Sequence, residues 1–175
     1  QGFAGEIDTS AAQRAVYATD NSIYERPPQA IVCPQHVADL QVLTRLLAQE
    51  HFRGVVVTAR GGGTGTNGQS LTEGIVVDVS RHMNHILNID VAKRQVRVQA
   101  GVVKDQLNRA LKPHGLFFAP ELSTSNRATI GGNLCNASPA ADGAPALLAL
   151  GAEVELLSEA GARRLKLAEF ILGPR

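Results

Sequence analysis

The most informative segment of this 175-residue chain reads Arg60-Gly61-Gly62-Gly63-Thr64-Gly65-Thr66-Asn67-Gly68. Five of the eight residues from 61 to 68 are glycine, whereas a simple turn between two strands needs far fewer. Without side chains in the way, successive backbone N–H groups can converge on an anion such as a phosphate. The side chains of Thr64, Thr66, Asn67 and Ser70 add donors, and Arg60 adds either charge or a brace. We therefore interpret residues 60–68 as a phosphate cradle, with a structural turn as the alternative.

Two familiar phosphate-binding motifs fit this segment only in part. Residues 63–68 satisfy the G-x-G-x-x-G pattern of a dinucleotide-binding loop, but that loop must open a helix, and here residues 69–74 lead directly into a predicted strand. The spacing of a nucleoside triphosphate-binding P-loop also fits, but Gln69 stands where that motif needs lysine. The remaining interpretation is a strand–loop–strand unit in which backbone amides neutralise the phosphate.

The residues around the loop predict an α+β chain. An apolar face repeats with helical spacing after Pro34, and β-branched or alternating runs mark the strands. The expected strands are 30–33, 55–58, 75–79, 86–90, 95–100, 152–157 and 164–167, and the expected helices are one from Pro34 that ends before Gly54 and one at 103–111. We expect residues 1–29 to be irregular and residues 119–145 to form a long polar loop.

The composition argues against several classes of function. Lys and Arg number 17 and Asp and Glu number 16, so a net charge of +1 gives no electrostatic footprint for nucleic acid or an anionic membrane. No apolar run is long enough for a transmembrane helix, and no signal peptide is visible. Cys33 and Cys135 form no CxxC pair, which favours free thiols in a reducing compartment such as the cytoplasm. His82 and His85 lack a third ligand at a suitable spacing, so we predict no metal site.

A second polar segment spans residues 120–142. It combines hydroxyl and amide side chains with small residues that let backbone lie against an extended ligand. The backbone N–H groups of Thr129, Gly131 and Gly132 are candidate donors, and Asp142 is a candidate acceptor for a ribose hydroxyl. Two donor-rich loops on either side of one cleft suit a dinucleotide with a pyrophosphate, whereas a long surface loop is the alternative.

Together the two segments resemble the FAD-binding domain of the vanillyl-alcohol oxidase and p-cresol methylhydroxylase (PCMH) type. The resemblance rests on residues 60–68, on Ala128-Thr129-Ile130-Gly131-Gly132, and on residues 77–84 as the strand that follows the first loop. It implies two α/β subdomains that grip an extended FAD: residues 1–100 with the pyrophosphate loop 60–68, and residues 101–175 with the flavin and ribitol loop 120–142. Thr64 stands where many relatives carry the histidine that bonds FAD covalently, so the resemblance implies noncovalent FAD.

Within that family, residues 1–132 look most like the bacterial FAD-linked dehydrogenases of D-2-hydroxyacids, of the 2-hydroxyglutarate and glycolate kind. This resemblance implies an oxidoreductase that passes a hydride from a small hydroxyacid to FAD. The family's last FAD-domain strands and its substrate-binding domain have no counterpart, so we expect a fragment, with an incomplete active site and with catalytic residues beyond residue 175. The implied cofactor-binding residues are Arg60, Gly61, Gly62, Gly63, Thr64, Gly65, Thr66, Asn67, Gly68, Ser70, Pro120, Glu121, Ser123, Ser125, Ala128, Thr129, Gly131, Gly132, Asn133, Asn136, Ser138 and Asp142.

The sequence leaves two other functions open. From residue 129 onward, and most clearly at 133–170, the chain resembles the FAD-binding subunit of the xanthine dehydrogenase type. That resemblance implies an electron-transfer module of a molybdenum hydroxylase. The third function class is a truncated, non-catalytic chain that binds nothing stably, because missing strands would leave a sheet edge exposed.

Overall fold

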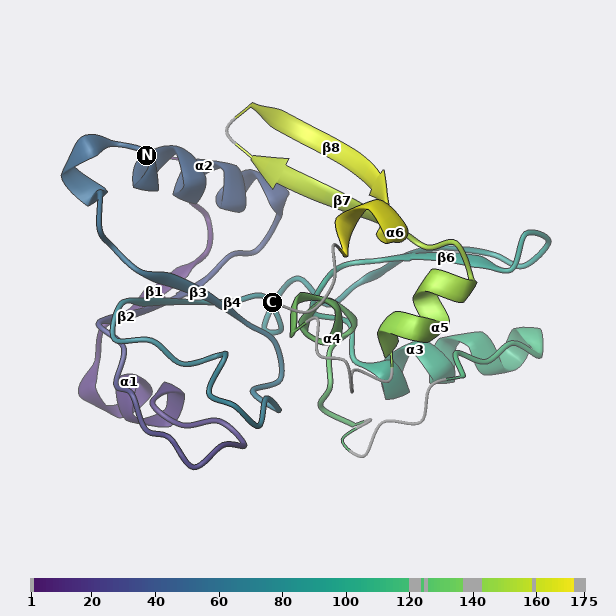
Figure 1. The fold of residues 1–175 in the computed structure, drawn as a ribbon, viewed down its shortest axis with the longest axis horizontal. Coiled ribbons are helices and arrows are strands. Elements are labelled where there is room, and N and C mark those ends of the chain that lie inside the picture. The colour runs from purple at the N-terminus through teal and green to yellow at the C-terminus, as the bar shows by residue number, and fades with distance from the viewer. Residues whose placement is uncertain (1, 120–123, 125, 137–142, 159, 172–175) are drawn as a thin grey trace.

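The computed structural model describes residues 2–119, 124, 126–136, 143–158 and 160–171, which form two α/β lobes (Figure 1). The first lobe contains a four-stranded sheet with the order β1-β2-β4-β3. Its strands are β1 (Glu6–Asp8), β2 (Ala30–Cys33), β3 (Val57–Arg60) and β4 (Ile75–Asp78). β1 runs antiparallel to β2, whereas β2, β4 and β3 are parallel. Helices α1 (Ala11–Tyr17) and α2 (Val37–Leu47) lie on opposite sides of this sheet, and the short 3-10 helix η1 (Glu50–Phe52) follows α2.

The core of the first lobe lies on both faces of the two central strands. Ile31 and Val32 of β2 and Val76 of β4 are all buried, as expected for parallel strands that are covered on both sides. Leu43 of α2 packs with Val32 on one of these faces. At the start of α2 the Asp39 carboxylate is fully buried and accepts the N–H groups of Ala4, Gln35 and His36, which ties the N-terminal segment to this helix.

The second lobe combines two antiparallel hairpins with short helices. The first hairpin contains β5 (Ile86–Asp90) and β6 (Gln95–Val98), and the second contains β7 (Glu153–Ser158) and β8 (Gly161–Lys166). The helices are α3 (Lys104–Leu111), η2 (Lys112–His114), α4 (Ile130–Asn136), α5 (Gly143–Ala149) and α6 (Leu167–Phe170). Val102, Leu107 and Leu111 form the core of this lobe with Phe118, and side chains of β5 and β6 pack against it. Because β5 and β6 pack against this core, they are grouped with the second lobe, whereas the sequence placed residues 1–100 in the first FAD-binding subdomain. That division of the chain stays a prediction.

The α+β class is confirmed, and both hairpins and both predicted helices occur close to their expected positions. Three local predictions are wrong. Residues 1–29 were expected to be irregular, but they contain β1 and α1. The strand expected at 55–58 is β3, which begins at Val57 and includes Arg60. The segment expected as a loop at 119–145 contains α4 and α5. The N-terminal elements were missed because β1 has three residues and α1 has no buried residue, so neither shows an apolar repeat. None of the helices in the described ranges has the length and apolar character needed to span a bilayer.

Candidate functional site

The glycine-rich segment lies in the connection between β3 and β4. These strands are adjacent and parallel, so residues 61–74 must cross back from the carboxyl end of β3 to the start of β4. No helix occurs in this described connection, which confirms the strand–loop–strand interpretation and the rejection of a dinucleotide-binding loop that opens a helix. The glycine-rich residues therefore follow directly after the carboxyl end of a parallel strand, where open α/β sheets bind their ligands.

The backbone amides of this segment are available to a ligand. Within the part of the chain that the structure describes, the N–H groups of residues 61–66 donate no hydrogen bond to a protein atom. The Asn67 N–H is an exception in the same segment, because it donates to Oε1 of Gln69 at 3.0 Å. Gly63 has φ of +64°, a left-handed conformation that favours glycine and turns the chain sharply. Free amides in a turned, side-chain-poor backbone fit the pyrophosphate of FAD, which needs several convergent donors.

Two glycines of the segment bring the two predicted motifs together. A Cβ atom on Gly61 would overlap the side chain of Thr129, and one on Gly62 would overlap the backbone carbonyl of Arg127. Gly61 and Gly62 are therefore packing positions, where only a residue without a side chain permits this approach. The loop of the first lobe thus contacts the segment that leads into α4, which lies at the junction of the lobes (Figure 1).

The second motif offers fewer free donors than the sequence suggested. The Gly131 N–H donates to the carbonyl of Ala100 at 3.0 Å, and the Gly132 N–H donates to Oγ1 of Thr129 at 3.2 Å. Thr129 is buried, with only 3% of its surface exposed. Two of the candidate donors, the amides of Gly131 and Gly132, are therefore already paired within the protein, where they hold the start of α4, and the role of these residues in cofactor binding stays a prediction.

Arg60 and Ser70 flank the loop and both are used within the protein. The Arg60 guanidinium donates to the carbonyls of Tyr17 and Thr19, at 3.4 and 2.9 Å, and lies 5.0 Å from the centre of the Tyr17 ring. Ser70 is buried, and its hydroxyl donates to the carboxylate of Asp20 at 2.8 Å. Of the two roles expected for Arg60, the structure shows that of a brace. The sequence suggested that the Ser70 hydroxyl donates to the ligand, whereas in the structure it donates to Asp20.

A partly buried hydroxyl–carboxylate pair lies next to Arg60. The Tyr17 hydroxyl donates to Oδ2 of Asp78, the last residue of β4, and Oδ1 of Asp78 accepts the amide and hydroxyl of Ser80. Burial and the hydrogen bond to Asp78 raise the pKa of Tyr17 above its ordinary value. Sequence reasoning missed Tyr17, Asp20 and Asp78, because nothing in their local sequence indicates that they meet the glycine-rich loop.

Several predicted site residues cannot be placed. Pro120, Glu121, Ser123, Ser125, Ser138 and Asp142 lie outside the described residues. Asn133 and Asn136 belong to α4. Among the residues that the structure does describe, no three His, Cys, Asp or Glu side chains come together to hold a metal ion.

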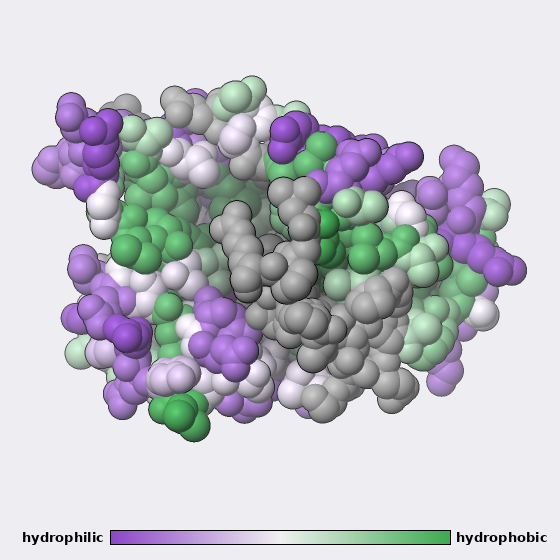
Figure 2. Space-filling view, viewed as in Figure 1, coloured by the Kyte–Doolittle hydropathy of each residue, from purple (hydrophilic) through white to green (hydrophobic). Residues whose placement is uncertain are grey.

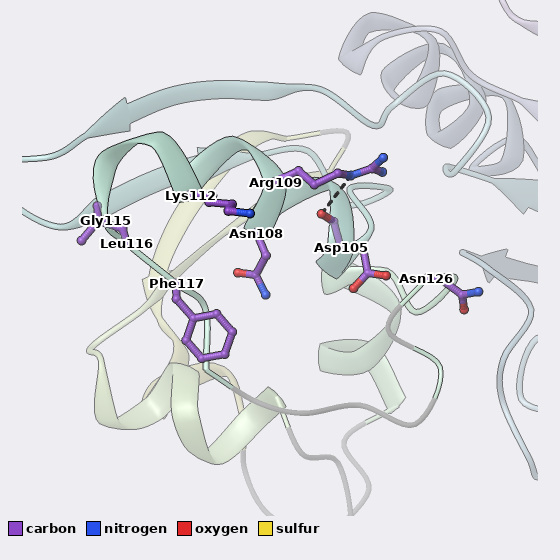
Figure 3. A pocket seen from close by; sticks show the side chains of 8 residues that line it. All are labelled: Asp105, Asn108, Arg109, Lys112, Gly115, Leu116, Phe117 and Asn126. Atoms are coloured by element: carbon purple, nitrogen blue, oxygen red, sulfur yellow. Dashed lines mark hydrogen bonds between the residues drawn. The ribbon is translucent and has the colours of Figure 1, made fainter.

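A separate cavity of about 780 Å³ lies along α3. Figure 3 shows its side chains, which come from α3, η2 and the segment around Phe117, with Asn126 on the far side. The Asn108 side chain accepts the Phe118 N–H at 2.8 Å and donates to the Phe118 carbonyl at 3.2 Å, so it holds this segment against the helix. No described residue of the glycine-rich loop lines this cavity.

Comparison with known families shows which family the chain belongs to. A family model described as "FAD binding domain" matches residues 28–154. The chain belongs to this family. The match spans the glycine-rich loop and the second motif, and it confirms the resemblance to the FAD-binding domain of the PCMH type. FAD is the cofactor of the chain.

Similar proteins include dehydrogenases and oxidases of hydroxyacids. The D-2-hydroxyglutarate dehydrogenase of Pseudomonas putida is 66% identical over 131 residues, which are 75% of this chain and 13% of that protein. The Escherichia coli D-2-hydroxyglutarate dehydrogenase is 59% identical over 132 residues, with the same coverage of both chains. Glycolate oxidase subunit GlcD of Bacillus subtilis is 37% identical over 131 residues, or 73% of this chain and 27% of that protein. The chain thus spans about an eighth of the length of the dehydrogenases it matches.

Solved structures share the fold at low sequence identity. An alkyldihydroxyacetonephosphate synthase superposes with a TM-score of 0.77 at 20% identity, covering 95% of this chain and 37% of the other. The 6-hydroxy-D-nicotine oxidase of Arthrobacter nicotinovorans gives a TM-score of 0.72 at 19% identity, covering 97% and 37%. Both matches extend across the second lobe. The comparisons do not support the separate resemblance of residues 133–170 to the xanthine dehydrogenase type.

Proposed function

We propose that this chain is the FAD-binding portion of a flavin-dependent oxidoreductase that oxidises a D-2-hydroxyacid, with D-2-hydroxyglutarate as the first candidate substrate. The observation that carries the proposal is the row of backbone amides at residues 61–66, which donate to no residue that the structure describes, in a segment that belongs to an FAD-binding family. The substrate class is supported by four D-2-hydroxyglutarate dehydrogenases that are 59–66% identical to this chain over about three quarters of its length.

The residues of the chain bind and orient the cofactor in this proposal. The amides of residues 61–66 bind the pyrophosphate, with the hydroxyls of Thr64 and Thr66 as further donors. Residues 120–142 line the flavin and ribitol. When bound, the flavin supplies the redox chemistry by accepting a hydride from the carbon that bears the substrate hydroxyl. The groups that bind the substrate carboxylate and take the hydroxyl proton are expected outside residues 1–175. We also propose the cytoplasm as the location, from the cysteine pattern and the buried free thiol of Cys33.

The first test is FAD binding by the chain, measured by flavin absorbance after desalting and by quenching of flavin fluorescence. We expect a Gly65→Arg variant to lose binding, because the new side chain enters the loop where Gly65 already lies against Gln69. Gly151→Asn is the matched control, since a side chain there meets nothing within 4 Å and asparagine tolerates its φ of +63°. Equal FAD affinity in Gly65→Arg and the wild type would contradict the loop assignment. Complete release of flavin into the supernatant after acid precipitation is expected for noncovalent FAD, because Thr64 stands where covalently linked relatives carry a histidine.

The second test addresses the substrate. The segment of the P. putida D-2-hydroxyglutarate dehydrogenase that matches this chain is replaced by this chain's residues. We expect the chimera to hold FAD, and we expect D-2-hydroxyglutarate, but not the L enantiomer, to bleach its visible absorbance without oxygen. A chimera that holds FAD but is not reduced by any D-2-hydroxyacid would contradict the proposed substrate class. The parent dehydrogenase is the positive control.

A further inference from the structure

The glycine-rich loop makes few hydrogen bonds of its own that could fix its shape. Its amides at residues 61–66 donate no hydrogen bond within the described part of the chain, and Gly63 and Gly68 have positive φ angles of +64° and +71°. Glycine-rich backbone has many accessible conformations and loses much entropy when it is ordered. Contacts from elsewhere must therefore hold this loop in one conformation before a ligand arrives.

One short segment, residues 17–24, supplies such contacts at both ends of the loop. Before the loop, Arg60 donates to the carbonyls of Tyr17 and Thr19. After the loop, the buried Ser70 hydroxyl donates to the Asp20 carboxylate at 2.8 Å. Near the last glycine, the Tyr24 ring lies 3.0 Å from the position that a Cβ atom on Gly68 would take.

The segment that makes these contacts is itself closed. Thr19 and Glu25 form an antiparallel bridge, and the Arg26 N–H donates to the carbonyl of Ala18 at 2.8 Å. Within this closed turn, the Ser22 N–H donates to Oδ1 of Asp20 at 2.8 Å, so each carboxylate oxygen of Asp20 has its own partner. A turn that is closed in this way can hold a flexible neighbour at a defined position.

The charge of Asp20 is also compensated. A carboxylate close to a phosphate-binding loop would repel the ligand unless it were neutralised. Burial by itself would raise the pKa of Asp20, but hydrogen bonds from Ser22 and Ser70, with the nearby Arg60 guanidinium, lower it below its ordinary value. The carboxylate therefore stays ionised and serves the protein as an acceptor.

We propose that residues 17–24 form a clamp that sets the shape of the pyrophosphate loop, with Asp20 and Ser70 as positioning residues for FAD. The identity of the ligand, FAD, rests on the proposed function, whereas the ordering of the loop by the clamp does not depend on it. The clamp lies outside residues 28–154, the range that the FAD binding domain family model matches. It therefore assigns a binding role to residues that the family match does not include.

The test compares Ser70→Ala and Asp20→Ala with the wild type. Ser70→Ala removes the donor of the hydrogen bond between these two residues, and Asp20→Ala removes its acceptor, whereas residues 60–68 stay unchanged. Thr44→Val is the matched control, since its half-buried hydroxyl donates within α2, to the carbonyls of Leu40 and Gln41. We expect FAD and ADP to bind about fivefold more weakly to both clamp variants, because each loses the hydrogen bond between Ser70 and Asp20 that orders the site. Thr44→Val should bind both ligands as the wild type does.

Backbone ¹⁵N relaxation of the ligand-free chain separates positioning from general destabilisation, because residues 61–66 donate to no described residue and so have no such hydrogen bond whose loss amide exchange could report. In the clamp variants, order parameters should fall at residues 61–68 and stay unchanged in β4 and α2, whereas a general loosening would lower them in all three. Wild-type FAD affinity in both clamp variants, or lower order parameters throughout the lobe, would overturn the clamp. Failure of the wild type itself to bind FAD would overturn the proposed function, and the order parameters of residues 61–68 would still decide whether the clamp orders the loop.

Discussion

The glycines at positions 61–63 have two different structural roles. Gly61 and Gly62 leave room for Thr129 and Arg127, so their role is contact between two parts of the protein. Gly63 instead supplies a left-handed backbone conformation. A count of glycines treats these positions alike, but their substitutions should have different causes and different effects.

Gly62→Ala should therefore disrupt the junction of the two motifs. The added methyl group would overlap the Arg127 carbonyl, and forcing extra atoms into a close-packed site costs about 1–3 kcal/mol. We expect a lower unfolding temperature and FAD affinity reduced by about tenfold or more. Thermal unfolding and fluorescence titration measure the two effects.

Gly115→Asn is the control for a glycine substitution on the same chain. Nothing lies within 4 Å of a Cβ atom there, and asparagine tolerates its φ of +65°. This variant should keep wild-type FAD affinity. If Gly62→Ala also keeps it, the contact with Arg127 does not shape the binding site.

Tyr17→Phe tests the hydroxyl–carboxylate pair behind the loop. Because burial and Asp78 raise the pKa of Tyr17, the folded protein holds this proton after an unfolded tyrosine has lost it. The stabilisation is complete below about pH 10 and is lost as the pH rises above that value. Tyr17→Phe should be less stable at neutral pH, because the buried Asp78 loses a donor, and its stability should fall less between about pH 10 and pH 11. Urea unfolding at each pH measures this, and parallel curves for the two proteins would show that Tyr17 does not titrate in this way.

At the scale of elements, β3 is both the source of the loop and an open sheet edge. In the described part of the chain it pairs only with β4. Val55 and Val56, just before the strand, are 38% and 60% exposed. Figure 2 shows hydrophobic side chains over the region that leads from η1 into β3. An exposed apolar edge of this kind can pair with a second chain.

Val56→Lys should reduce this association. A charge at the edge opposes strand addition, and the position lies before β3, away from the loop. We expect slower aggregation by light scattering at raised temperature and unchanged FAD affinity. Val91→Lys is the control, since Val91 is 44% exposed in the turn between β5 and β6 and should not affect aggregation. Equal aggregation rates for Val56→Lys and the wild type would show that this edge does not drive association.

At the scale of the whole molecule, the cofactor loop touches both lobes. Gly61 and Gly62 follow β3 in the first lobe and pack against residues 127–129, which lead into α4 of the second lobe. A ligand held at this junction should stabilise both lobes together.

FAD at about one hundred times its Kd should raise the free energy of unfolding by about 2.7 kcal/mol. Hydrogen exchange should slow both in β4 and in α3. ADP, which carries the pyrophosphate without the flavin, should also stabilise the chain. Protection confined to one lobe would show that the loops of the two lobes do not share the ligand.

Consecutive residues were enough to predict the strand–loop–strand unit and the α+β class. The information is local: the glycines and hydroxyls of residues 60–70, and the missing helix signal at 69–74, exclude the other phosphate-binding motifs. The periodicity of α2 and α3 likewise placed both helices.

Contacts between distant positions were decided by the tertiary structure alone. Ser70 meets Asp20 across 50 residues, and Arg60 turns to carbonyls more than 40 residues away. Gly62 lies against Arg127. The amide of Gly131 donates to the carbonyl of Ala100, and that of Gly132 donates to the Thr129 hydroxyl. No local pattern encodes which remote carbonyl or carboxylate a polar group will reach, because burial and chain topology select that partner only when the whole chain is packed.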